Sequence, residues 1–240
     1  MILRCRRMCC VALVVLSGCA TVQTPDDRDP WESMNRSVFS FNDKADRIVF
    51  KRVATLYRDV LPSWARKGVH NFFGNLGDVW SAVNNALAVR KQETGDSISR
   101  VVVNTTLGVL GLFDVATDLK IERHKADFGT TLGRWGVKPG PYVVLPLLGP
   151  ATLREVAALP VDYRANLTNQ FSEAATRDSL VLLNLVDARA TFLGAGDAVE
   201  GAALDAYSFV RDVYLQRQRY LQYDGNPPDE DQPVDDEPRP

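Results

Sequence analysis

The spacing of apolar residues limits this chain more than any other feature of its sequence. Along most of residues 30–220, apolar residues recur every three or four positions, which is the period of an amphipathic α-helix. The first such stripe consists of Trp31, Met34, Val38, Phe41, Ala45 and Ile48. The sequence shows neither an alternation of strands with helices nor an internal repeat. It therefore predicts an all-α class of fold built from amphipathic helices.

Prolines and capping residues predict where the helices begin. A first helix is expected at Asp29, which caps it, with Pro30 in the first turn and Glu32 completing a capping box. Thr152 and Glu155 form a second capping box. Further helices are predicted at residues 62–87, 96–107, 112–119, 178–193 and 197–219.

The centre of the chain departs from this helical pattern. Residues 128–150 contain five glycines and four prolines, and Tyr142–Leu145 is the only plausible strand within them. We expect a structured loop or a short hairpin here. The segment is a candidate hinge or gate, with the residues Gly129, Gly133, Gly136, Gly140, Pro141 and Tyr142. A rigid structural loop is an equally good interpretation of the same residues.

The cysteines all lie at the start of the chain, at residues 5, 9, 10 and 19. Nothing from residue 20 onward can therefore form a disulfide or a thiolate site. Residues 1–18 have the layout of a secretory signal peptide, and Leu16–Cys19 resembles a bacterial lipobox. Such a signal implies that Cys19 becomes the first residue and carries the lipid anchor. An ordinary cleaved signal with a coincidental cysteine is the alternative.

Acylation would hold the chain at a membrane without a spanning helix. Two or more acyl chains anchor a protein stably, at about 0.8 kcal/mol per buried methylene. Ala20 follows the cysteine in place of the aspartate that resembles an inner-membrane retention signal, so we expect the outer membrane, on its periplasmic side. Residues 19–28 are predicted to be a tether. The longest later uncharged stretch, Pro139–Leu153, contains four prolines, whereas a spanning helix needs about 20 mainly apolar residues.

Charge is distributed unevenly along the chain, although its formal net value is only −2. Residues 1–18 carry +3, whereas residues 224–240 contain seven acidic residues and one arginine, which gives −6. Residues 29–223 are thus predicted to form one nearly neutral domain, followed by a disordered acidic tail at 224–240. A chain without a basic excess is not expected to bind nucleic acid.

The sequence contains little of the chemistry that enzymes use. His70 and His124 are its two histidines, which excludes a site built from several histidines. Nucleotide-binding, zinc-protease and serine-hydrolase motifs are missing. We therefore predict no catalytic residue, no metal and no cofactor.

Short motifs across residues 29–219 together resemble one known family. They are Asp29-Pro30, Asn35-Arg36, Phe39–Asn42, Asn71–Leu76, Asn104–Gly108, Gly111–Ala116, Asp127–Gly133, Trp135–Val137, Gly140–Pro146, Leu148–Pro150, Thr152–Arg154, Ala206-Tyr207 and Arg211–Tyr214. In this order they resemble the MlaA (VacJ) family of outer-membrane lipoproteins. Departures at residues 52–53, 77–79, 151 and 155–157 concern local loop shape.

This resemblance implies a ring-like helical protein in the inner leaflet of the outer membrane, beside trimeric porins. It implies that the protein removes mislocalised phospholipid from the outer leaflet and passes it to a periplasmic phospholipid carrier. Because no nucleotide-binding motif is present, we expect a passive conduit. The alternatives are a porin-associated structural lipoprotein without a lipid path, and a lipid hydrolase that uses His70 or His124.

A lipid path needs an apolar rim for acyl chains beside a polar lumen for the headgroup. On the first predicted helix, Phe41 adjoins Asn35, Arg36 and Asn42, and these four residues are the predicted path. More asparagines accompany the second helix, at residues 71, 75, 84 and 85. The simpler alternative is that the apolar residues form an ordinary core and the asparagines serve as caps and turns.

Overall fold

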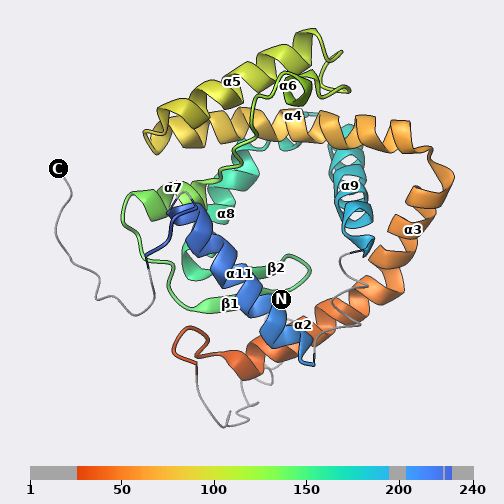
Figure 1. Ribbon diagram of the computed structural model, residues 1–240. Coiled ribbons are helices and arrows are strands. Elements are labelled where there is room, and N and C mark those ends of the chain that lie inside the picture. Colours follow the sequence, from red (N-terminus) through yellow and green to blue (C-terminus); the bar gives the residue numbers. More distant parts are fainter. Residues whose placement is uncertain (1–25, 195–203, 224, 229–240) are drawn as a thin grey trace, which may run out of the picture.

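The computed structural model describes residues 26–194, 204–223 and 225–228. Helices dominate this part of the chain, and one two-stranded sheet accompanies them, so the predicted class is confirmed at this level (Figure 1). The predicted signal peptide, the anchor Cys19 and most of the acidic tail lie outside the described residues. Within the described residues, no helix combines the length and hydropathy that crossing a membrane requires.

The chain begins with one unbroken helical path over residues 32–60. It comprises α2 (Glu32–Ala45), the π-helical stretch η2 (Asp46–Phe50) and α3 (Lys51–Val60). The predicted helix is confirmed, but the prediction that Asp29 caps it is wrong. Trp31 occupies the N-cap position without a side-chain cap. Asp29 is buried and bonds Asn35 and Tyr207, partners too distant in sequence for a capping pattern to indicate.

The next two helices pack against each other as an antiparallel pair. They are α4 (Ser63–Leu87) and α5 (Lys91–Thr106), joined by a tight turn at Val89, whose φ is 59°. Helix α5 begins five residues before its predicted start at residue 96. The helix predicted at residues 112–119 is reduced to the single turn α6 (Val115–Asp118), because Asp114 caps it by accepting a hydrogen bond from the Thr117 amide.

The glycine-rich centre is more regular than predicted. It contains α7 (Phe128–Arg134), which Asp127 caps, and a hairpin of β1 (Tyr142–Leu145) and β2 (Gly149–Thr152). The hairpin was one of the two predicted alternatives and strand β1 was predicted, whereas α7 and the residues of β2 were not. The strands are antiparallel, with Val144 opposite Pro150. A proline lacks the amide that a ladder needs, so β2 gives a weak strand signal.

The last described helices complete the packing. Helix α8 (Leu153–Ala165) begins with the predicted Thr152–Glu155 capping box, which is confirmed. It is followed by η3 (Leu167–Gln170), α9 (Ala174–Thr191) and α11 (Ala206–Gln222). Helix α9 packs on α3 and α4, and α11 packs on α7 and β2. In Figure 1, α4, α3, α2, the hairpin with α11, and α7 with α8 follow one another around the molecule. A ring with a polar lumen stays a prediction.

Polar groups occupy the interior to an unusual degree. Among the described residues, eighteen polar or charged residues are buried but only nine hydrophobic ones. The apolar core joins Tyr142, Val144 and Tyr207, with Val38 and Phe39 packed beside them. Conversely, most of the predicted apolar stripe along α2 and η2 lies at the surface, with Met34 and Ile48 exposed. Water-soluble domains rarely bury charged residues, so the buried charges of this protein are unusual.

Candidate functional site

Two asparagines on one face of α2 hold the β-hairpin. Asn35 is fully buried; its Nδ2 donates to the Tyr142 carbonyl at 3.1 Å, and its Oδ1 accepts from the Val144 amide at 2.8 Å. Seven residues later, Asn42 donates to the Leu145 carbonyl at 2.9 Å and accepts from the Leu147 amide at 2.8 Å. Seven residues are two helical turns, so both side chains reach the same side of α2. They satisfy backbone groups of β1 and its turn as another strand would.

Arg36, between these asparagines in sequence, connects α2 to α11. Its guanidinium pairs with Glu32 at 2.7 Å and with both carboxylate oxygens of Asp205, at 3.1 and 2.6 Å. It also lies 4.4 Å from the centre of the Tyr207 ring. The hydrogen bond from Arg36 lowers the pKa of Asp205, so this pair remains charged.

Asp29 forms the buried centre of the same region. Its carboxylate accepts hydrogen bonds from Asn35 at 2.8 Å and from the Tyr207 hydroxyl, and Arg211 lies 3.4 Å away. Burial raises the pKa of Tyr142 and of Tyr207, and Asp29 raises both further. Both phenols are therefore neutral at physiological pH. The Tyr142 hydroxyl is buried without a hydrogen-bond partner among the described residues, which is costly in a folded interior.

Phe41 points away from this polar cluster. Phe41 is 53% exposed, and Met34 of the same helix and Trp31 at its N-cap position are exposed as well. Helix α2 thus presents an apolar outer face and a polar inner face that binds the hairpin and α11. Within the described residues, Met34 and Phe41 of this helix remain uncovered, which is the pattern of a surface that contacts something apolar.

Comparison with known proteins identifies the family. A family model described as MlaA lipoprotein matches residues 27–221. The chain belongs to the MlaA family. The intermembrane phospholipid transport system lipoprotein MlaA of Escherichia coli (strain K12) is 33% identical over 213 residues, which cover 86% of this chain and 84% of that protein. An uncharacterized protein of Rickettsia bellii (strain RML369-C) is 32% identical over 213 residues, covering 88% and 82%.

A solved structure agrees with this assignment. It is described as the structural basis for maintenance of bacterial outer membrane lipid asymmetry, and it superposes on this chain with a TM-score of 0.71 at 32% identity. The match covers 81% of this chain and 98% of that one. The resemblance to the MlaA family inferred from the motifs is thereby confirmed, and the fold of the described residues agrees with it.

The structure brings together two groups of residues that the sequence had suggested separately. The predicted path residues Asn35 and Asn42 bind β1, which contains Tyr142 of the predicted gate. Of the gate glycines, Gly136 and Gly140 have φ of +88° and +69°, conformations that side chains disfavour. Their roles in a lipid path or a gate stay predictions for this MlaA-family chain.

The other two gate glycines let α7 approach α8. A Cβ on Gly129 would lie 2.9 Å from Glu155 Cγ, and one on Gly133 would lie 2.7 Å from Arg154 Nη1. These glycines are therefore explained by close packing inside a helix pair, whether or not the segment also moves. Gly133 and Arg154 are both buried.

Sequence reasoning missed a second buried polar network, between α4, α5 and α6. Arg100 is 1% exposed and binds both carboxylate oxygens of Asp114, at 2.7 and 2.8 Å, with Asp78 at 3.3 Å. Burial alone would raise the pKa of Asp114, but hydrogen bonds from Thr117, Asn104 and Arg100 outweigh it and lower the pKa to about 2. Ser97, Arg100 and Asn104 recur at helical spacing, a polar stripe that could have indicated this network.

The histidines of the hydrolase alternative both face carboxylates. His70 Nδ1 lies 3.0 Å from Asp187, which also accepts from the Tyr57 hydroxyl at 2.9 Å, so it links α3, α4 and α9. His124 Nε2 lies 3.1 Å from Asp96. The first contact joins helices to one another, and the second joins the segment before α7 to α5, as structural histidines do.

Proposed function

We propose that this chain is an outer-membrane lipoprotein that takes mislocalised phospholipids from the outer leaflet and passes them to a periplasmic carrier. The observation that carries the proposal is the inverted distribution of polarity in the described residues, with buried charges and amides and exposed large hydrophobic side chains. The chain shares the MlaA family with proteins named for intermembrane phospholipid transport. Its anchor is Cys19, and its place is the inner leaflet beside trimeric porins.

The energetics of the cargo explain why such a distribution suits the task. A phospholipid drawn through water loses the burial of about 30 methylenes, on the order of 25 kcal/mol. Its charged headgroup cannot cross hydrocarbon at acceptable cost. A ring of helices with an apolar circumference and a polar lumen offers both environments at once. The chain needs no catalytic step or cofactor for this, and its partners impose the direction of transport.

Several exposed apolar surfaces support immersion in a lipid monolayer. The turn between α5 and α6 exposes Leu107, Val109, Leu110, Leu112 and Phe113. Helix α4 holds this turn in place, because Asn71 of that helix donates to the Leu112 carbonyl at 3.1 Å. Helices α4 and α5 also form an open groove of about 350 Å³ lined by alanine, valine and isoleucine side chains. Water would oppose exposure of these surfaces, whereas acyl chains would cover them.

The hairpin is the element that we assign to the gate. Asn42 holds its turn through two hydrogen bonds that are partly open to solvent, while Asn35 holds its buried strand. Loss of the Asn42 contacts should free the turn and leave the strand in place. The gate would then open or close without partner control, so transport would change while the fold is kept.

The test compares variants in cells that lack the chromosomal gene. Outer-leaflet phospholipid is measured with an amine-reactive reagent that does not cross membranes. We expect deletion to raise the labelled fraction, and Asn42→Leu to alter it relative to the unmodified chain. Ser37→Ala is the control, because among the described residues the Ser37 side chain bonds only within its own helix, to the Ser33 carbonyl. Membrane levels and co-purification with porins are measured in parallel.

Each rival function has its own outcome in this experiment. Unchanged labelling on deletion would refute the lipid conduit. A scaffold predicts that Asn42→Leu and Arg36→Gln behave as the unmodified chain whenever porin association is preserved. A hydrolase requires fatty acid release by the purified protein, abolished by substitution of His70 or His124.

A further inference from the structure

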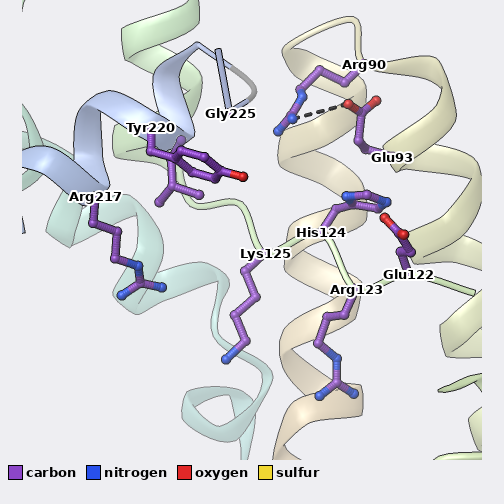
Figure 2. A pocket seen from close by; sticks show the side chains of 10 residues that line it. Arg90, Glu93, Glu122, Arg123, His124, Lys125, Arg217, Tyr220 and Gly225 are labelled. Atoms are coloured by element: carbon purple, nitrogen blue, oxygen red, sulfur yellow. Dashed lines mark ion pairs between the residues drawn. The ribbon is translucent and has the colours of Figure 1, made fainter. Parts of the chain in front are cut away.

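A basic pocket lies apart from the hairpin region, at the C-terminal end of α11. Its volume is about 490 Å³, and Figure 2 shows its walls: α11 on one side, the segment 122–125 in the middle and the α4–α5 turn on the other. Arg90, Arg123, Lys125 and Arg217 line it together with Glu93 and Glu122. The lining is therefore more basic than acidic.

Two of the four cations already have carboxylate partners. Arg90 pairs with Glu93 at 3.2 Å, and Arg123 pairs with Asp78 at 3.1 Å. Lys125 and Arg217, in contrast, make no hydrogen bond or ion pair with any residue in the described ranges. Figure 2 shows them on neighbouring walls of the pocket, with Glu122 on the other side of His124 from Lys125. Both positive charges are available to an anionic ligand.

The chain itself supplies many carboxylates next to this pocket. Gly225 lines the pocket, and its φ of +83° turns the chain back after α11. Its amide donates a hydrogen bond to the Tyr220 carbonyl at 2.9 Å. Arg219 then donates to the Pro228 carbonyl, which holds the end of this stretch against α11. Six of the next nine residues, 229–237, are acidic.

This geometry gives the acidic residues a large advantage over a free anion. A residue spans at most about 3.6 Å of extended chain, so acids only a few residues beyond Pro228 can approach α11 and its pocket. A ligand on such a short flexible link reaches an effective concentration of about millimolar or more. Oppositely charged groups attract over a screening length of about 8 Å at physiological salt.

We propose that the basic pocket is a carboxylate-binding site whose occupant is the acidic segment 229–240 of the same chain. Its carboxylates bind Lys125 and Arg217. The segment thereby joins α11 to the α4–α5 pair, and any other anion must displace it to enter the pocket. The inference is independent of the lipid path, since the pocket lining includes none of the hairpin residues that the proposed gate uses.

The test is zero-length coupling in the purified full chain in detergent. A carbodiimide joins a lysine amine to a carboxylate only when the two touch, and peptide mass spectrometry locates the amide. We expect Lys125 to couple to acids within 229–237, and the yield to fall at 1 M salt, where the screening length is about 3 Å. Coupling of an added small amine to exposed carboxylates of the same chain reports that the reagent works.

Variants separate binding from chance proximity. Arg217→Gln keeps both coupling groups and removes one of the two cations, so we expect the yield to fall at least threefold. Lys67→Gln removes an equal charge near the opposite end of α4 and should leave the yield unchanged. Circular dichroism confirms that each variant is folded.

Three results would overturn the proposal. The first is absence of Lys125 coupling to residues 229–237 while the added amine couples to exposed carboxylates. The second is an equal yield in Arg217→Gln and the unmodified chain. The third is coupling only between different molecules, detected in a mixture of isotope-labelled and unlabelled chains, which would mean that the segment binds another protein.

Discussion

Replacement of Asn35 by leucine is expected to be among the most damaging single changes to this fold. Leucine has the same branched skeleton of heavy atoms, so no cavity forms, but it leaves the Tyr142 carbonyl and the Val144 amide buried without partners. Each orphaned group costs about 1–3 kcal/mol, or about 4 kcal/mol for the two together. Asp29 keeps its Tyr207 and Arg211 partners, so it adds little to this cost.

Thermal unfolding followed by circular dichroism measures this effect. For a chain of this size, 1 kcal/mol corresponds to about 2–4 °C in Tm, so we expect Asn35→Leu to lower Tm by on the order of 10 °C. Asn42→Leu is the matched variant: water can reach the exposed turn and replace its partners, so the expected loss is about 1 kcal/mol. Equal decreases in Tm for the two variants would refute the reasoning. They would mean that burial does not determine how much each hairpin contact contributes to the free energy of unfolding.

Other contacts lead to three further predictions. Gly108→Ala should lower the free energy of unfolding by about 1–3 kcal/mol, because the added Cβ would overlap backbone oxygens. Gly77 has open space around it, so Gly77→Ala should raise the free energy of unfolding by about 0.5–1 kcal/mol. Urea titrations measure both changes. Arg100→Met should lower the free energy of unfolding by about 3–5 kcal/mol, because it removes the ion-pair partner of the carboxylates of Asp78 and Asp114. A loss below 1 kcal/mol would contradict a stabilising role of this network. Because the pKa of Asp114 is lowered from 3.8 to about 2, its charged form stabilises the fold above pH 3.8, and this contribution disappears as the pH falls toward 2. Melting curves of Asp114→Asn should therefore depend less on pH in that range than those of the unmodified chain.

Local patterns predicted the helices well and their tertiary roles poorly. The stripe from Trp31 to Ile48 correctly indicated a helix, since spacing alone fixes which residues share a face. It could not indicate that the stripe points outward, because periodicity is the same for a face covered by protein and a face covered by something else. Knowledge of the family was needed to expect exposed hydrophobic residues.

The errors share one physical cause, which is that distant partners override local preference. Asp29 has the position and chemistry of a cap, yet Asn35 and Tyr207 bind its carboxylate more completely than a helix end could. Gly129 and Gly133 weaken a helix in isolation, but α7 forms because the two glycines let it lie close to α8. For the candidate site, the sequence identified Asn35 and Asn42 as polar positions on α2. It did not indicate that both bind the backbone of the hairpin.

The contact between Asp29 and Tyr207 joins residues 178 positions apart. Closing so long a loop is entropically slow, and it requires almost the entire polypeptide to have been delivered. The first helix can contact the hairpin earlier, but it cannot complete its contacts until the last described helix, α11, arrives. In the export that we propose, the polar residues of α2 therefore stay hydrated until α11 arrives, and the protein completes its inverted distribution of polarity after it has crossed the inner membrane.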